Sequence, residues 1–244
     1  WRSHAQSVAS SVGAKPYVIQ AAKKAIGDHL KRVGLDGEAL DSVVPSMYRL
    51  KYEIKGEPLI SILIPNKDHV SDLRKCIVSI QEKTSYPNYE IIDIENNSEE
   101  EKTFQYYQLL EKRRNIRVVC WNGKFNYSAI NNFGYTFAKG EYILLLNNDT
   151  EVISADWLQE MLMYAQRGDV GAVGAKLYYS DNTVQHGGVV LGVGGVAAHL
   201  HCNRQKEDPG YMGRLIYAQD LTAVTAACMM LPRKVWEETG GLDE

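Results

Sequence analysis

The stretch EYILLLNNDTEV, residues 141–152, joins a run of bulky aliphatic residues to an abrupt polar ending. The run stops at two amides and a carboxylate, Asn147, Asn148 and Asp149. Carboxylate and amide oxygens are the ligands that hard divalent cations such as Mg²⁺ accept. Asn and Asp are also common turn formers. The stretch alone therefore allows two interpretations, in which Asp149 either closes a turn or holds a metal ion.

Three further apolar runs, within residues 59–65, 89–95 and 116–121, also end in polar residues. These endings are Pro65-Asn66-Lys67-Asp68, Glu95-Asn96-Asn97-Ser98 and Trp121-Asn122. The preference of Asn, Asp and Ser for turns explains any one of these endings. It explains less well why every apolar run changes so abruptly to polar residues. In parallel sheets, ligands bind outside the carboxyl ends of the strands. We therefore favour a polar ligand cleft at this edge over a row of ordinary turns.

The segments between the apolar runs carry helical periodicity. Helices are predicted over residues 70–84, about 99–113, around 130–137 and 157–165, the last with Ser154 as its N-cap. In the second helix, Phe104, Tyr107 and Leu110 are expected to point inward. The stretch VGAVGAKLYY, residues 170–179, is predicted to form one further strand. Strands that alternate with amphipathic helices indicate an α/β fold with a mostly parallel sheet covered by helices on both faces.

The first part of the chain has a different pattern. One helical face is predicted to carry Ile19, Ala22, Ile26, Leu30 and Val33, and a possible edge strand follows within residues 47–58. Pro16 and Gly34 suit the two ends of this helix. The sequence thus predicts an N-terminal helical appendage and linker over residues 1–57, and an α/β domain over residues 58–244.

Composition narrows the classes of protein and partner. With 45% hydrophobic and 23% charged residues, the chain is typical of soluble globular proteins. A net charge of -3 gives no reason to expect nucleic acid as a partner. Four scattered cysteines without a CxxC pair argue against a disulfide framework or a zinc site, and favour a reducing, cytoplasmic compartment. The longest weakly polar run, residues 189–200, is too short to span a bilayer.

Several blocks together resemble glycosyltransferase family 2, which has the GT-A fold. They are PLISILIPNKDHVSDLRKCIVSI, YEIIDIENNS, NNFGYTFAKGEYILLLNNDTEV and AACMMLPRKVWEETGGLDE, and they cover about residues 59–244 in the family's order. The most similar subgroup comprises bacterial enzymes that build surface polysaccharides or glycosylate cell-surface proteins. The start of the chain is similar to the segment before the second domain of tandem glycosyltransferases. The resemblance therefore implies one domain of a larger enzyme.

The resemblance implies transfer of a sugar from a nucleoside diphosphate sugar, with UDP favoured, to a glycan or glycoprotein acceptor with inversion. Asp149 would hold Mn²⁺ or Mg²⁺, which stabilises a leaving diphosphate. The donor-binding positions would be Pro65, Asn66, Lys67, Glu95, Asn97, Ser98, Asn131, Asn132, Asn147 and Asn148. Glu95 stands where the family has an Asp that accepts a hydrogen bond from the base. Asn131 replaces a family Arg, and either Lys139 or the metal ion is expected to compensate for the lost positive charge.

On the acceptor side the resemblance places Thr225, while His199 and His201 alternate as neighbours in a strand would. A metal site formed by two histidines needs further ligands, so we favour acceptor contact or plain surface for this pair. The catalytic base stays unknown and is expected beyond Glu244, because Asp243 and Glu244 belong to the preceding block. The predicted partners are a nucleotide-sugar donor and a glycan or glycoprotein acceptor. No transmembrane segment is predicted, and the formation of homo-oligomers is left open.

Two other functional classes remain open at this point. A sugar nucleotidyltransferase needs a glycine-rich loop with a basic residue after its first strand, and PNKDHVSD, residues 65–72, lacks the glycines. A non-catalytic module that binds donor or organises a multidomain glycosylation protein is compatible with a base that lies outside the chain.

Overall fold

The computed structural model describes residues 17–244, so Trp1 and Pro16 lie outside the described residues. The chain divides into two compact units. One consists of the described residues up to Glu53 together with Lys176–Thr222, and the other of Ile54–Ala175 together with Ala223–Glu244. The predicted boundary after residue 57 stays a prediction. Within residues 17–244, no helix combines the length and apolar character that crossing a membrane requires.

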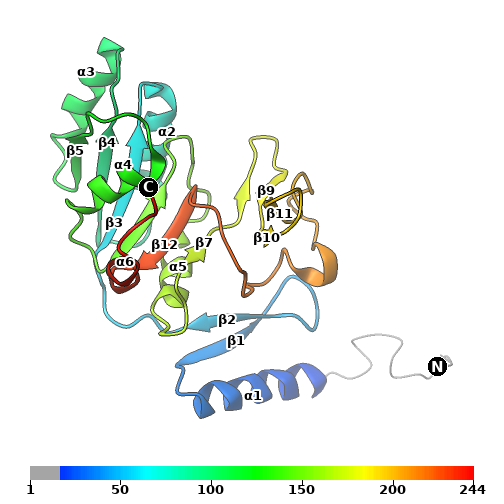
Figure 1. The fold of residues 1–244 in the computed structure, drawn as a ribbon. Coiled ribbons are helices and arrows are strands. Elements are labelled where there is room, and N and C mark those ends of the chain that lie inside the picture. Colours follow the sequence, from blue (N-terminus) through cyan, green and yellow to red (C-terminus); the bar gives the residue numbers. More distant parts are fainter. Residues whose placement is uncertain (1–16) are drawn as a thin grey trace. The chain divides into compact units, whose positions relative to one another are not determined.

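The second unit contains a six-stranded sheet (Figure 1). Its strands in spatial order are β5 (Ile116–Cys120), β4 (Tyr89–Glu95), β3 (Ile60–Asn66), β6 (Tyr142–Leu146), β12 (Cys228–Pro232) and β7 (Val173–Gly174). The first four are mutually parallel, whereas β12 runs antiparallel to both β6 and β7. The prediction of a mostly parallel sheet is therefore confirmed.

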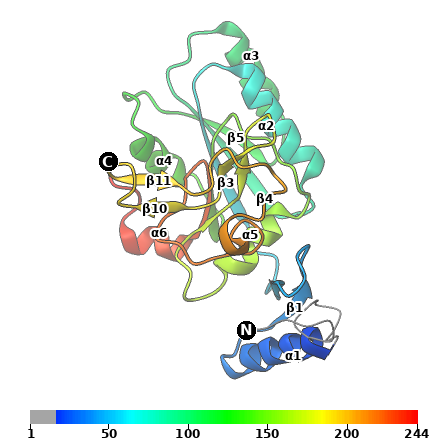
Figure 2. The same cartoon turned by 90° about the vertical axis from the view of Figure 1, so that its right-hand side faces the viewer.

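Helices cover both faces of this sheet (Figures 1 and 2). They are α2 (Val70–Lys83), α3 (Glu101–Leu110), α4 (Tyr127–Tyr135), α5 (Trp157–Ala165) and α6 (Arg233–Thr239). Alternate strand residues such as Leu63 and Ile92 form one buried cluster with Ile130 of α4 and Trp236 of α6. Because successive strand residues point to opposite faces, Asp93 lies on the other face.

The order of the strands creates a switch point. The chain adds β4 and β5 on one side of β3, and then places β6 on the other side of β3. Crossover connections therefore leave in opposite directions from the carboxyl ends of β3 and β6, which is the position where open α/β sheets bind their ligands. Asn66 ends β3, and the polar turn after β6 begins at Asn147.

The first unit contains short elements. Helix α1 (Tyr17–Arg32) buries Leu30, and β1 (Gly37–Asp41) pairs antiparallel with β2 (Tyr48–Tyr52). Strand β2 lies within the predicted residues 47–58, whereas β1 was missed because GEALD has almost no apolar pattern. The later part of the unit holds β8 (Leu177–Tyr178), β9 (Val184–His186), β10 (Val189–Leu191), β11 (Ala197–His199) and the 3₁₀ turn Tyr211–Gly213.

Three local predictions need correction. Residues 170–179 form two short strands, β7 and β8, which belong to different sheets and different units. Asp156 rather than Ser154 precedes α5, and Ser154 contributes only its carbonyl oxygen to the Trp157 N–H at 3.3 Å. Phe104 is 42% exposed, because the buried face of α3 runs through Thr103, Tyr106, Tyr107 and Leu110.

Candidate functional site at the carboxyl edge of the sheet

The register of the sheet aligns the predicted strand ends. Asn66 pairs with Glu95, and Glu95 pairs with Cys120. Leu63 of β3 pairs with Leu145 of β6, an offset that carries Asn66 level with Asn148. The side chains meet there, since Asn148 Nδ2 donates to Asn66 Oδ1 at 2.6 Å. The structure thus brings the polar residues after β3, β4 and β6 to one place.

Asn66 and Glu95 are buried at this edge, at 3% and 5% exposure. Both point toward α3, where Tyr107 contacts them: its hydroxyl donates to Glu95 Oε2 at 2.8 Å and accepts from Asn66 Nδ2 at 2.7 Å. Ser98 donates to the Glu95 carboxylate through both its backbone N–H and its hydroxyl. Burial raises the pKa of the Tyr107 hydroxyl. Sequence reasoning assigned Tyr107 only to the core and missed these polar contacts.

The turn after β6 is fixed by its backbone. The Asn147 N–H donates to the Ala227 carbonyl at 3.0 Å, and the Asn147 carbonyl accepts from the Thr150 hydroxyl at 2.8 Å. Asp149, by contrast, is exposed, and its carboxylate forms no hydrogen bond or ion pair with residues 17–244. The turn therefore presents an uncommitted carboxylate from a rigid support.

A divalent cation fits this carboxylate if other ligands come from elsewhere. Among residues 17–244, no group of three His, Cys, Asp or Glu side chains is arranged to hold a metal ion. Mg²⁺ is commonly bound by one or two carboxylates together with substrate phosphates and water. Asp149, whose carboxylate has no partner among residues 17–244, is compatible with that mode of binding and not with a closed protein cage.

The turn after β3 is strained and carries a helix cap. Asp68 and His69 both have left-handed φ angles, 52° and 46°. The Asp68 carboxylate accepts from the backbone N–H groups of Glu99 and Glu100 at 3.0 and 2.9 Å, and so caps α3. Burial alone would raise the pKa of Asp68, but these donors outweigh it and hold that pKa below its usual value. Lys67 is exposed and lies 3.4 Å from the Glu99 carboxylate.

The turn after β4 positions Asn97 and Ser98. Asn97 adopts a left-handed φ of 56° and donates through Nδ2 to the Gly123 carbonyl at 2.8 Å. The Ser98 hydroxyl accepts from the Asp68 N–H at 2.9 Å. These bonds tie the turns after β3, β4 and β5 to one another. The donor-binding roles of Asn97, Ser98, Pro65 and Lys67 stay predictions.

Asn131 and Lys139 lie in different surroundings from those expected. Asn131 is fully buried, and its Nδ2 donates to the Tyr127 carbonyl at 2.8 Å, so its side chain is held against its own helix and is not open to solvent. The backbone N–H of Lys139 donates to Ser61 and Glu90, near the starts of β3 and β4. Lys139 therefore lies at the amino edge of the sheet, which corrects the idea that it compensates for the family Arg.

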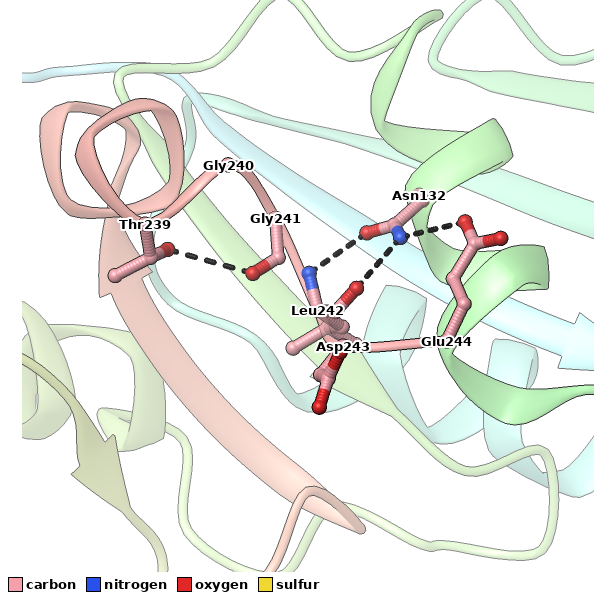
Figure 3. Close-up of a pocket in the computed structure, with 7 residues that line it drawn as sticks. All are labelled: Asn132, Thr239, Gly240, Gly241, Leu242, Asp243 and Glu244. Atoms are coloured by element: carbon pink, nitrogen blue, oxygen red, sulfur yellow. Dashed lines mark hydrogen bonds between the residues drawn. The ribbon is translucent and has the colours of Figure 1, made fainter.

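Asn132 of α4 holds the last residues of the chain (Figure 3). Its Oδ1 accepts from the Leu242 N–H at 2.8 Å, and its Nδ2 donates to the Leu242 carbonyl and to Glu244, both at 2.9 Å. Gly241 has a φ of +88°, and a Cβ there would lie 2.6 Å from Asn132 Oδ1. The hollow beside them, about 420 Å³, is lined by Asn132, Thr239, Gly240, Gly241, Leu242, Asp243 and Glu244.

Of the acceptor-side predictions, Thr225 lies just before β12, and its hydroxyl accepts from the Ala227 N–H at 3.4 Å. Ala227 in turn bonds Asn147, so Thr225 belongs to the same sheet edge. His199 and His201 lie in the other unit. They are not alternating strand neighbours: β11 ends at His199, and His201 has a left-handed φ of 57°. His199 Nδ1 lies 2.9 Å from the Nδ1 of buried His186.

Comparisons with known proteins agree with this architecture. The model of the family described as "Glycosyl transferase family 2" matches residues 61–240. The whole chain is 43% identical to an uncharacterized protein, y4gI, of Sinorhizobium fredii, and 92% of it is 41% identical to the O-antigen biosynthesis protein RfbC of Myxococcus xanthus. The chain spans only 27% and 18% of these two relatives.

A solved structure supports the fold. The mannosyltransferase PcManGT of Pyrobaculum calidifontis, in complex with GDP-Man and Mn²⁺, superposes with a TM-score of 0.55 at 12% identity, over 78% of this chain and 48% of that one. Since the family model covers most of the chain, and the sheet with its switch point has the expected GT-A arrangement, the chain belongs to glycosyl transferase family 2.

Proposed function

We propose that this protein transfers a sugar from a nucleoside diphosphate sugar, UDP being favoured, to a glycan or glycoprotein acceptor with inversion. The uncommitted carboxylate of Asp149 at the switch point carries this proposal. Similarity to RfbC supports a place in bacterial cell-surface polysaccharide synthesis. We further propose that the protein works in the cytoplasm at the inner face of the membrane, where nucleotide sugars are available.

The residues of the sheet edge divide the work of binding. Asp149, with the diphosphate and water, would hold Mn²⁺ or Mg²⁺, and the Mn²⁺ in the PcManGT complex supports such a cation. When bound, the cation offsets the negative charge that develops on the leaving diphosphate. Asn147 and Asn148 would bind a ribose hydroxyl or a metal-bound water from the same turn. Because the backbone of this turn is hydrogen-bonded to Ala227, just before β12, these groups need little reorganisation when the donor binds.

The acceptor hydroxyl must approach the anomeric carbon from the side opposite the diphosphate for a single displacement with inversion. Thr225 is suited to acceptor contact, since it lies beyond Asn147 at the same edge. An α-linked donor should then give a β-linked product, which NMR of the anomeric proton measures. A product with retained configuration would exclude this mechanism.

The metal-dependent step of binding is tested with Asp149→Ala. Calorimetric titration of UDP with and without Mn²⁺ should show that the variant loses the Mn²⁺-dependent gain in affinity while its melting temperature without ligand is unchanged. Glu151→Ala, which removes another exposed carboxylate two residues away, is the matched control and should bind as the wild type does. If Asp149→Ala kept the full Mn²⁺ effect, Asp149 would be a turn residue only.

The class of reaction is tested separately by product analysis. Incubation of the protein extended beyond Glu244, where the base is expected, with UDP, GDP and dTDP sugars should release nucleoside diphosphate as sugar is transferred to acceptor or water. Release of pyrophosphate would indicate a nucleotidyltransferase instead. Binding of donor without any turnover would indicate a non-catalytic donor-binding module.

A further inference from the structure

Tyr107 lies at the centre of a series of hydrogen bonds that joins three strand ends. Its hydroxyl contacts Glu95 at the end of β4 and Asn66 at the end of β3. Asn66 in turn contacts Asn148, in the turn after β6. The three distances are 2.8, 2.7 and 2.6 Å. We call the series Glu95–Tyr107–Asn66–Asn148 the amide relay.

The donor and the acceptor of each hydrogen bond in the relay are fixed by the carboxylate of Glu95. A carboxylate only accepts hydrogen bonds, so the proton of the Tyr107 hydroxyl is directed at Glu95. The hydroxyl oxygen then accepts from Asn66, which must turn its NH₂ group toward Tyr107. The second hydrogen of that group is donated to the Asp68 carbonyl at 3.1 Å. The Asn66 side-chain oxygen therefore faces Asn148, and it accepts a hydrogen bond from the Asn148 NH₂ group.

The direction of the relay decides what Asn148 presents to a ligand. Its NH₂ group is held inward by Asn66, so its carbonyl oxygen is directed away from the relay. Asn148 is only half-buried, and it immediately precedes the exposed Asp149. An oxygen in this position suits a divalent cation or a hydroxyl donor. An amide turned the other way would present NH₂, which cannot coordinate a cation and cannot accept the hydrogen of a hydroxyl donor.

We propose that Tyr107 is a positioning residue of the donor site, which fixes the amide of Asn148 so that an oxygen stands beside Asp149. The proposal rests on the proposed function, since it assumes that the ligand is a nucleoside diphosphate with its cation. It assigns a role to a hydroxyl from α3 that touches no ligand itself.

The test compares Tyr107→Phe with Tyr106→Phe in titrations of UDP with and without Mn²⁺. Tyr106 is the adjacent tyrosine of α3, is 8% exposed and packs against Arg74, so its variant controls for the loss of a hydroxyl from this helix. Tyr107→Phe should weaken UDP binding about tenfold, the effect of one good hydrogen bond, while Tyr106→Phe stays within about twofold. A loss seen only with Mn²⁺ assigns the oxygen to the cation, and a loss in both conditions assigns it to a nucleotide hydroxyl.

A double-mutant cycle tests whether Tyr107 affects UDP binding through Asn148. In an Asn148→Ala background, Tyr107→Phe should have no further effect on UDP affinity, because the group that it orients is gone. A full additional loss in this background would overturn the proposal, as would unchanged affinity of the single variant.

A measurement without ligand separates this proposal from the proposed function. The side-chain NH₂ resonances of Asn148 and Asn66 should shift in Tyr107→Phe and stay in place in Tyr106→Phe. Unchanged resonances in Tyr107→Phe would refute the relay. If these shifts occurred in a protein that bound no nucleoside diphosphate, the relay would be real, and both the proposed function and the donor-site role of Tyr107 would be wrong.

Discussion

Replacing Asp93 by leucine should stabilise this protein. Asp93 is fully buried in β4, beside Ile64 and Val118 of the neighbouring strands. Neither carboxyl oxygen has a hydrogen-bond partner among residues 17–244. An unsatisfied buried polar group costs about 1–3 kcal/mol. Leucine keeps the branching of the side chain and replaces two oxygens with methyl groups.

The expected gain follows from these terms. Removing the unsatisfied carboxyl group should gain about 1–3 kcal/mol, but the methyl groups of leucine are larger than the oxygens they replace, and this overpacking cancels part of the gain. We therefore expect a net increase of roughly 1–2 kcal/mol in the free energy of unfolding. At this chain length that corresponds to a rise of roughly 2–8 °C in melting temperature. Denaturant unfolding at acidic pH, where Asp93 is neutral, measures the effect of removing the uncharged carboxyl group, without any contribution from its charge. A leucine variant less stable than wild type would show that the pocket around Asp93 is polar or too small.

The pH dependence gives a second measurement. Burial, assisted by the charge of Glu95, raises the pKa of Asp93 well above its ordinary 3.8. A carboxyl whose pKa is raised by folding stabilises the fold below pH 3.8, and this contribution is lost as pH rises toward the folded pKa. Wild type should therefore lose stability relative to Asp93→Asn from about pH 4 upward. A difference independent of pH would refute the assignment.

Three further predictions use other parts of the structure. Asn132→Ala should speed hydrogen exchange of the Leu242 amide about 30-fold, because it removes two hydrogen bonds worth about 1 kcal/mol each; unchanged exchange would argue against the contact. Burial and the nearby His199 lower the pKa of His186 to about 4, so the free energy of unfolding should fall between pH 6.5 and 4, and His186→Phe should flatten this fall. If Glu95 reads the base, Glu95→Gln should weaken UDP more than GDP in parallel titrations; equal losses would assign Glu95 to the support of the site alone.

The repeated strand and helix pattern was predictable because buried parallel strands read as continuous apolar runs. The grouping of strand ends followed, since carboxyl ends of parallel strands share one edge. The same rule places residues after a crossover helix at the opposite edge, which accounts for the position of Lys139. Spacing along the chain therefore predicted which turns meet, though not every residue near them.

The contacts of Tyr107 could not be predicted in this way. They depend on how α3 is rotated, and the apolar pattern of Phe104, Tyr107 and Leu110 indicated a slightly different face. The partner of β6 was equally hidden, because β12 lies more than 80 residues later and runs antiparallel. Asp93 interrupts an apolar run without any local signal of what surrounds it. Such features are determined by tertiary packing rather than by local sequence.

The chain leaves the sheet after β7 and returns at β12, the strand beside it. The two points lie together, since a Cβ added at Gly174 would touch the side chain of Val224. Residues 176–222 are thus an insertion whose two ends are neighbours, and the cost of closing such a loop rises only slowly with its length. Evolution can therefore lengthen, shorten or exchange this segment while the strands that carry Asn66 and Asp149 stay unchanged. We therefore expect related proteins to share the sheet and to differ in the length and sequence of this insertion.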